Sequence, residues 1–266
     1  MNWFGVFPAV TTQFRADESI DFAATQALVA RQVDEGVHGI VALGTCGENC
    51  SLTAAEKRDV LRAVREVTAG KVPLVAGVAE PTTRMAIEYL RDADAIGVDG
   101  YMVLPAVVYK ASRREAIQHF RSVAAATDRP IMIYNNPKSY DVDVTVDMLV
   151  ELAELPNVKA VKEASEDTRR VTDLINAGGD RYAIFAGVDD FVLETIMLGA
   201  VGWVSGFTSA FPRESIRLFE LAREGRHEEA KPLYRWFMPL LHLDSMPSLV
   251  QCIKLVCSIV GRGTEH

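Results

Sequence analysis

The chain has 266 residues, of which 49% are hydrophobic and 24% are charged, a balance typical of a globular protein with a large buried core. Its formal net charge of −8 disfavours a nucleic-acid-binding role, because such surfaces are usually basic. No apolar stretch approaches the roughly 18 residues needed to cross a bilayer, and residues 1–14 lack the features of a signal peptide, so we expect a cytoplasmic protein with no membrane partner.

Short apolar segments recur along the whole chain and predict buried β-strands. They are rich in Val and Ile, and Gly or Pro bounds them. Most are apolar on both faces, as expected of parallel strands covered on each side. The predicted strands are 5–14, 39–44, 73–79, 100–105, 130–135, 158–163, 182–188 and 202–206.

A longer amphipathic segment follows each predicted strand and predicts a helix. The segment 51–70 has the clearest start, because Thr53 and Glu56 have the spacing of a capping box, and it ends at Gly70. The other predicted helices are 22–36, 82–97, 112–127, 145–155, 167–179, 190–200 and 212–225.

Eight strand–helix units in succession predict an α/β fold of the (β/α)₈ TIM-barrel type, which we place at residues 1–225. A doubly wound open sheet is the alternative, but no G-x-G-x-x-G fingerprint follows the first strand. Two more apolar segments, 228–244 and 247–261, predict additional C-terminal helices in the region 226–266. We expect them to cover the barrel or a neighbouring subunit.

The four cysteines are Cys46, Cys50, Cys252 and Cys257. We expect reduced thiols, because disulfide scaffolds are denser in cysteine and usually shorter. Cys46 and Cys50 are four residues apart, but no second pair with metal-ligand spacing follows. The sequence therefore predicts no metal site.

Two lysines lie on the predicted strand 158–163. The chemistry of a (β/α)₈ barrel collects at the carboxyl ends of its strands. Lys159 is expected at the opposite end, in solvent, whereas Lys162 is expected at the mouth among apolar neighbours. Burial disfavours an ammonium, and a free amine is a nucleophile for carbonyl carbon. The alternative is that Lys162 pairs with a carboxylate, Glu163 or Glu48.

Two other strand ends share this mouth. GTCGEN (44–49) follows the second strand, and its glycines allow a tight turn with exposed amides. These amides and the Thr45 hydroxyl suit a small carboxylate, or the segment is a plain turn. YNNP (134–137) ends the fifth strand, and its Tyr134 either relays a proton or is a core aromatic residue.

Together these segments resemble a known family. GTCGEN, YNNP and VKEAS (161–165), with FPAVTTQF (7–14) and the run 187–189, resemble the dihydrodipicolinate synthase / N-acetylneuraminate lyase family over nearly the whole chain. The resemblance implies a homotetramer, often a dimer of dimers, with a small-molecule substrate. Family members usually continue by one more helix, so we expect a shortened C-terminal region.

The resemblance also implies the roles of the site residues. Lys162 would form a Schiff base with a 2-oxo acid, and no cofactor would be required. Tyr134 would shuttle protons, and Thr45 with the amide of Cys46 would hold the substrate carboxylate. Gly47 and Val204 are assigned to substrate binding on the same basis.

Several family features are altered. The synthase usually has an arginine two residues after the proline of its Y-N-x-P motif, where this chain has Ser139. Its P-Y-Y motif is replaced by LPAVVYK (104–110), in which Tyr109 is displaced in register. Cys46 replaces a threonine, and we expect a neutral thiol, because no positive partner for a thiolate is evident. These changes argue against lysine biosynthesis.

Three other segments resemble one branch of the family, the 1-pyrroline-4-hydroxy-2-carboxylate deaminases of hydroxyproline catabolism. They are NNPKSYDVD (135–143), GAVGWVSGFTSAFPRES (199–215) and YRWFMPLLHLD (234–244). The resemblance implies that Lys162 attacks the ring imine carbon, the 4-hydroxyl leaves as water, and hydrolysis releases ammonia and 2,5-dioxopentanoate. The alternatives are a synthase-like aldolase, a sugar-acid dehydratase, or a ligand-binding barrel without turnover. The presence of both Lys162 and Tyr134 disfavours the last.

Overall fold

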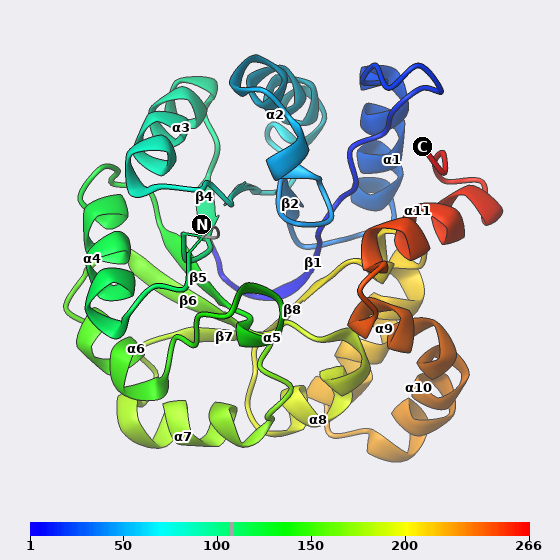
Figure 1. Ribbon diagram of the computed structural model, residues 1–266. Coiled ribbons are helices and arrows are strands. Elements are labelled where there is room, and N and C mark those ends of the chain that lie inside the picture. Colours follow the sequence, from blue (N-terminus) through cyan, green and yellow to red (C-terminus); the bar gives the residue numbers. More distant parts are fainter. Residues whose placement is uncertain (107–108) are drawn as a thin grey trace.

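Eight parallel strands form a nearly closed barrel surrounded by helices in the computed structural model, which describes residues 1–106 and 109–266 (Figure 1). The (β/α)₈ prediction is confirmed. The strands are β1 (Gly5–Pro8), β2 (Ile40–Ala42), β3 (Leu74–Val78), β4 (Gly100–Val103), β5 (Ile131–Asn135), β6 (Val158–Glu163), β7 (Ala183–Ala186) and β8 (Gly202–Ser205).

The strands are ordered β1-β8-β7-β6-β5-β4-β3-β2, so that each pairs with its neighbour in sequence and β1 pairs with β8. Between β1 and β2 the barrel is closed by a single parallel bridge from Ala9 to Val41. The amide of Val10 adds a hydrogen bond to the Val41 carbonyl at 2.9 Å. The predicted strand 5–14 was therefore too long, because β1 ends at Pro8 and only this bridge continues it.

The helices between the strands agree with the predicted segments. They are α1 (Phe22–Asp34), α2 (Ala54–Thr68), α3 (Thr83–Ile96), α4 (Arg113–Ala124), α6 (Val146–Leu152), α7 (Arg169–Gly178), α8 (Val192–Met197) and α9 (Pro212–Arg223). Short 3₁₀ turns occur at η1 (Asn49–Ser51), η2 (Asp189–Phe191) and η3 (Phe207–Ser209). No helix within the described ranges is long and apolar enough to cross a bilayer.

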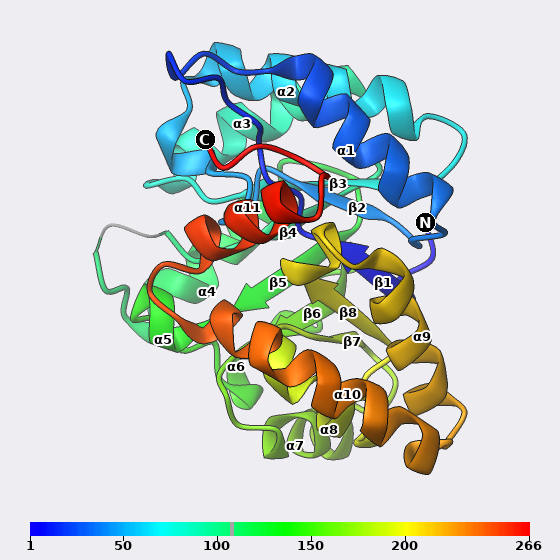
Figure 2. The ribbon, with the colours of Figure 1, turned by 90° about the vertical axis from the view of Figure 1, so that its right-hand side faces the viewer.

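One helix was not predicted. α5 (Pro137–Tyr140) follows β5 directly, and Figure 2 shows it at the end of the barrel toward which the strands run. The Asn136 side chain caps it by accepting a hydrogen bond from the Ser139 amide at 3.1 Å, and Pro137 supplies a first residue with helical φ. A helix this short has no apolar periodicity, so the pattern that predicts longer helices does not detect it.

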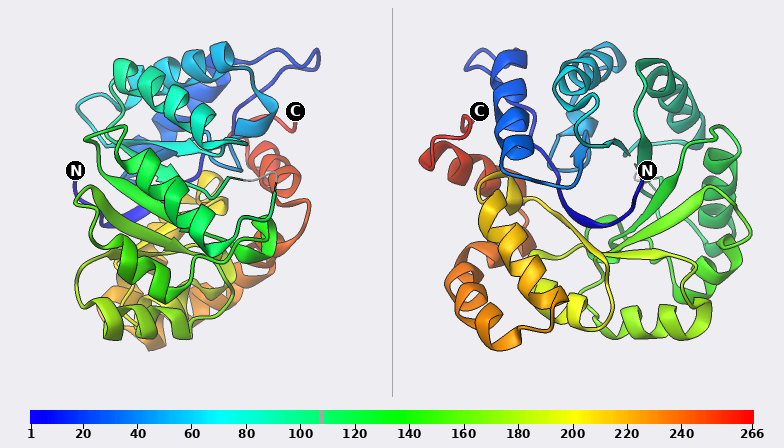
Figure 3. Two further views of the ribbon diagram at one scale, coloured as in Figure 1. Left: turned by 60° about the vertical axis from the view of Figure 1, so that its left-hand side comes forward. Right: turned by 180° about the vertical axis from the view of Figure 1, so that it is seen from behind.

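Aromatic side chains fill the barrel interior. Phe7, Phe185 and Trp203 are fully buried, and the rings of Phe7 and Phe185 meet edge to face at 5.4 Å. Trp3 stacks on Phe7 near the amino terminus. The amino terminus lies at the end of the barrel opposite the carboxyl ends of the strands (Figure 3, right). A Cβ at Gly202 would lie 2.2 Å from the Phe185 ring, so only glycine fits there. The described interior of the barrel is thus a packed core and not a pore.

The two predicted C-terminal helices are α10 (His227–Leu241) and α11 (Leu249–Ile259), joined through the 3₁₀ turn η4 (His242–Ser245). They cover the flank of the barrel that faces the viewer in Figure 2. Lys254 of α11 is buried, pairs with Glu48 beyond β2 and lies 4.5 Å from the centre of the Phe14 ring. α11 is therefore attached to the turn that follows β2.

The capping box of α2 is present as predicted. The Thr53 hydroxyl accepts from the Glu56 amide at 3.3 Å, and the Glu56 carboxylate accepts from the Thr53 amide at 2.8 Å. Replacing Thr53 by Ala removes one of these two caps, so we expect the free energy of unfolding to fall by about 1 kcal/mol. Urea denaturation measures this change. Thr53→Ser keeps a hydroxyl and should lose much less, and equal losses in both variants would contradict the capping role.

Candidate functional site

A cavity of about 430 Å³ opens at the carboxyl end of the barrel. Its wall combines residues that follow β2, β5, β6, β7 and β8 with the segment 244–249 that connects α10 to α11. Six side chains on this wall carry groups that matter for the chemistry considered below: Thr45, Cys46, Tyr134, Tyr140, Lys162 and Asp244. Four of them are residues that the sequence analysis selected.

Lys162 lies near the end of β6, beside Tyr134 in the register of β5 and β6. It is only 6% exposed, and its Nζ lies 4.1 Å from the centre of the Tyr134 ring. Lys159, on the same strand, is exposed at the other end of the barrel. The sequence analysis therefore placed both lysines correctly.

The alternative in which Lys162 is a structural ion-pair partner has no support from the geometry. Glu48 pairs with Lys254 instead. Glu163 accepts hydrogen bonds from the Asn135 side chain at 3.1 Å and from the Ser165 amide at 2.7 Å. Both candidate carboxylates thus have other partners, and the Lys162 amine faces the cavity.

Three hydroxyl groups, those of Thr45, Tyr134 and Tyr140, line the cavity together with Lys162. The Tyr134 hydroxyl accepts a hydrogen bond from the Asn136 side chain at 3.1 Å, and burial raises the pKa of this phenol above its usual value. The Tyr140 ring meets the Tyr134 ring edge to face at 5.8 Å, and its hydroxyl is hydrogen-bonded to the Thr45 hydroxyl. Sequence reasoning quoted Tyr140 within NNPKSYDVD but assigned it no role.

The turn after β2 brings Thr45 and Cys46 to the cavity wall, as predicted. Gly47 lies behind them, where a Cβ would come within 2.7 Å of the Leu43 amide nitrogen, so it permits the turn without lining the cavity. Burial first, and then the negative charge of Asp244, raise the pKa of the Cys46 thiol to about 12. The group is therefore a neutral thiol.

Val204 is fully buried in the apolar core of the barrel, and the cavity wall is formed instead by Gly206, two residues further along. Tyr109 is 85% exposed and lies outside the cavity. Val107 and Val108 of the LPAVVYK segment lie outside the described residues. The structure thus does not bring Val204 or Tyr109 to Lys162.

Two carboxyl groups that sequence reasoning left without a role flank the mouth. Asp189 is completely buried after β7 and accepts hydrogen bonds from Trp203 Nε1 (2.8 Å), Ser205 Oγ (2.8 Å) and the Phe207 amide (3.2 Å). Its own amide donates to Asp244 Oδ2 at 3.4 Å. Burial raises the pKa of Asp244 to about 6. The sequence analysis quoted Asp189 within the run 187–189 after the seventh predicted strand and Asp244 as the last residue of the segment 234–244, but gave neither a role.

The charges at the entrance are largely neutralised. Lys138 pairs with Glu166, and Ser139 lines the wall beside them. Among the described cavity residues, Lys162 is the one cation without an ion-pair partner within 4 Å. Across residues 1–106 and 109–266, no three His, Cys, Asp or Glu side chains gather as metal ligands would.

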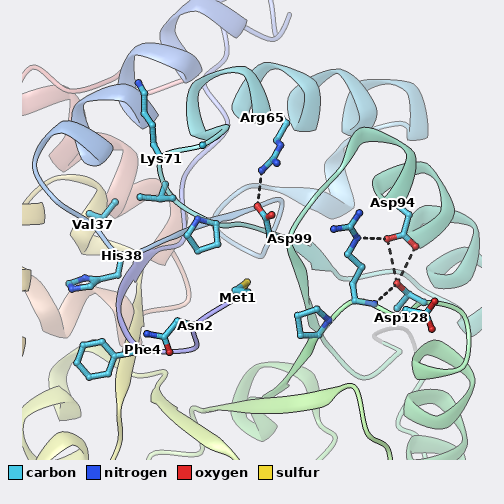
Figure 4. A pocket seen from close by; sticks show the side chains of 16 residues that line it. Met1, Asn2, Phe4, Val37, His38, Arg65, Lys71, Asp94, Asp99 and Asp128 are labelled. Carbon is cyan, nitrogen blue, oxygen red and sulfur yellow. Dashed lines mark hydrogen bonds and ion pairs between the residues drawn. The ribbon is translucent and has the colours of Figure 1, made fainter.

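A larger hollow of about 1060 Å³ lies at the opposite, amino end of the strands (Figure 4). Its arginines are engaged in ion pairs, Arg65 with Asp99 at 2.7 Å and Arg129 with Asp94 at 3.3 Å. This end of a (β/α)₈ barrel serves stability and not chemistry. The smaller cavity around Lys162 is therefore the candidate active site.

Comparison with known proteins agrees with this placement. A model of the dihydrodipicolinate synthetase family matches residues 2–266, so the chain belongs to that family, and the lyase function of the family applies to it. It is 32% identical to a 4-hydroxy-tetrahydrodipicolinate synthase of Methanospirillum hungatei over 97% of this chain and 89% of the relative. It is 33% identical to the synthase of Acidobacterium capsulatum over 100% of this chain and 89% of that one.

Solved structures show the same barrel. A dihydrodipicolinate synthase from Bacillus anthracis superposes with a TM-score of 0.95 at 30% identity, over 99% of this chain and 90% of that chain. The synthase from Acinetobacter baumannii, solved in complex with pyruvate, gives a TM-score of 0.94 at 28% identity, over 98% and 90%. The fold and family are thus shared, whereas the residues at the mouth decide the substrate.

The neutral thiol of Cys46 has a measurable consequence. At pH 8, well below its pKa of about 12, almost no thiolate is present, and the side chain is 7% exposed. We expect iodoacetamide to label the exposed Cys50 first and to reach Cys46 only after unfolding, as read from peptide masses. Rapid labelling of Cys46 in the folded protein would show that its thiolate is stabilised.

Proposed function

We propose that this protein is a Schiff-base-forming lyase whose substrate is 1-pyrroline-4-hydroxy-2-carboxylate, which it converts to 2,5-dioxopentanoate and ammonia. The supporting observation is the charge inventory of the cavity. One cation, Lys162, has no ion-pair partner among the described wall residues, and one turn offers amides and a hydroxyl to a carboxylate. This inventory suits a small substrate with a single carboxylate.

The turn after β2 would orient the substrate. The Thr45 hydroxyl and the amides of this turn would bind the carboxylate, and C2 of the ring would lie next to Lys162 Nζ. The rest of the wall includes Met102 and Leu249, which exclude water from the reacting carbon. A fixed carboxylate held next to the Lys162 side chain in a small cavity supplies much of the catalysis through orientation alone.

The covalent chemistry begins when the Lys162 amine attacks C2 of the cyclic imine. The C2–N bond of the ring then breaks, and the former ring nitrogen leaves C2 as a primary amine that stays attached to C5. A proton leaves C3 for Tyr134 as the Tyr134 hydroxyl passes its own proton to the freed primary amine, which gives an enamine, and the 4-hydroxyl then departs as water. Tautomerisation and hydrolysis at C5 release ammonia, and hydrolysis at C2 releases the product and frees Lys162.

The names of the relatives favour a second candidate, the condensation of pyruvate with an amino aldehyde by a 4-hydroxy-tetrahydrodipicolinate synthase. That reaction brings a second carboxylate into the cavity. The position of the usual arginine is Ser139, and the nearby Lys138 is paired with Glu166. The site therefore offers little to a second anion, which is why we rank this candidate lower.

Borohydride trapping tests the proposal. The protein is incubated with 4-hydroxy-1-pyrroline-2-carboxylate or with pyruvate and then reduced, and the adduct is located by peptide mass while ammonia is measured. We expect an adduct on Lys162 with the pyrroline acid, together with ammonia release. Lys162→Ala should abolish both.

Lys159→Ala is the matched control, because it removes a lysine from the same strand at the solvent-exposed end. It should trap and turn over like the parent protein. An adduct with pyruvate alone, without ammonia from the pyrroline acid, would move the assignment to the aldolases. No adduct on Lys162 with either compound would refute the Schiff-base mechanism.

We also propose a homotetramer. Large apolar side chains are exposed on the C-terminal helices, with Ile259 74% exposed, Trp236 57% and Leu255 48%, and Tyr109 is exposed elsewhere on the surface. Leu255 and Ile259 lie one turn apart on α11 and so share a face, and contiguous exposed apolar patches mark association surfaces. Sedimentation equilibrium should give about four times the mass of the chain, and Ile259→Asp should lower the mass. A monomer at micromolar concentration would exclude this proposal.

A further inference from the structure

Asp244 enters the cavity from the C-terminal part of the chain, on the turn η4. Gly206 leaves space here, because a Cβ there would lie 2.4 Å from Ile253 Cδ1 and 3.3 Å from both Asp244 Oδ1 and Cys46 Sγ. The carboxyl therefore reaches the wall beside the turn that follows β2. Asp244 is the one acidic side chain of the described wall besides Glu166, which is engaged with Lys138.

Contacts from η2 hold Asp244 in place. The Asp189 amide donates to Asp244 Oδ2 at 3.4 Å. On either side of it in η4, His242 Nδ1 lies 2.9 Å from Asp190 Oδ2 and Ser245 Oγ donates to the Asp190 carboxylate at 3.4 Å. These three contacts fix η4 against the residues that follow β7 and thereby fix the position of Asp244 in the cavity wall.

The neighbouring carboxyl determines which of the two holds a proton. Asp189 accepts from an indole N–H, a hydroxyl and a backbone amide, two of which can only donate. These donors stabilise its carboxylate. Burial, and then the negative charge of Asp244, raise the pKa of Asp189 well above its usual value, and burial raises the pKa of Asp244 to about 6. The pair therefore holds a proton, which we assign to Asp244 because the three donors to Asp189 favour its ionised form.

We propose that Asp244 is the general acid that protonates the departing 4-hydroxyl group, an inference that rests on the deamination proposed above. Tyr134 and Tyr140 are weaker acids, because burial raises the pKa of both phenols. A carboxylic acid delivers a proton to a leaving hydroxyl far more readily than a phenol does. Tyr134 would then take part in removing the proton from C3, and Asp244 would protonate the 4-hydroxyl.

The step balances within the cavity. The enamine nitrogen on Lys162 supplies its electron pair, a C3–C4 double bond forms, and the C4–O bond breaks. The proton of Asp244 joins the departing oxygen, which leaves as water. The products are a positively charged iminium on Lys162 and the Asp244 carboxylate, whose opposite charges attract each other. Asp244 then regains its proton from solvent.

The surroundings of Asp244 set its working pH. Lys162 on β6 favours its ionised form, whereas Asp190 on η2 and burial favour its protonated form; Asp189, Cys46 and Tyr134 are the other titratable groups that face it. Its pKa of about 6 means that the proton is held below pH 6 and lost above it. The rate of the elimination step should therefore fall as pH rises through 6. This fall in the pH–rate profile should be absent when Asp244 is replaced by Asn.

The experiment compares two reactions in Asp244→Asn. With 4-hydroxy-1-pyrroline-2-carboxylate, ammonia release should fall by about 100-fold or more, the usual contribution of a general acid, while the trapped Lys162 adduct accumulates. Pyruvate has no leaving group, so exchange of its methyl hydrogens in deuterium oxide should proceed as in the parent protein. Asp128→Asn, an exposed position at the opposite end of the barrel, is the matched control for both reactions.

The outcomes separate this inference from the proposed function. A parent protein that releases no ammonia from the pyrroline acid refutes the deamination and the role of Asp244 with it. If the parent protein is active and the variant is equally active, only the role of Asp244 is refuted. If the variant loses adduct formation and pyruvate exchange together, Asp244 orients Lys162 and is not the acid.

Discussion

The buried carboxylate of Asp189 organises the carboxyl end of the barrel. Asp189 follows β7, and its carboxyl group accepts hydrogen bonds from Trp203 and Ser205 of β8 and from the first amide of η3. Its backbone amide donates a hydrogen bond to Asp244. Burying a carboxyl group is costly unless its oxygens have hydrogen-bond partners. The three donors meet that requirement, and in doing so they fix two strand ends and the C-terminal segment relative to Lys162. The cavity therefore depends on a residue that does not line it.

Much of this architecture could be predicted from sequence, because the signals are local. Eight apolar segments separated by amphipathic ones specify the barrel, and the position of Lys162 four residues into its strand places it at the mouth. Tyr140 and Asp244 could not be found in this way. Tyr140 belongs to a helix too short to have a period, and Asp244 approaches the site from a part of the chain that has no strand at all.

Of the binding residues assigned by family resemblance, some line the cavity and others do not. A matching motif predicts where the backbone of a residue lies, but it does not predict whether the side chain of that residue reaches the cavity. Thr45 and Cys46 line the wall, whereas Gly47 supports the turn from behind and Val204 packs in the apolar core. The barrel and its lysine are shared with proteins named as synthases, but the side chains around the lysine differ in charge, and charge decides which anion can enter.

The pairing of Lys254 with Glu48 connects two segments that leave the ribosome far apart in time. The turn that follows β2 is synthesised early, but its glutamate has no buried lysine until α11 emerges. A growing chain would thus complete its eight strands before α11 can pair with the turn that follows β2 and before Asp244 can reach the cavity.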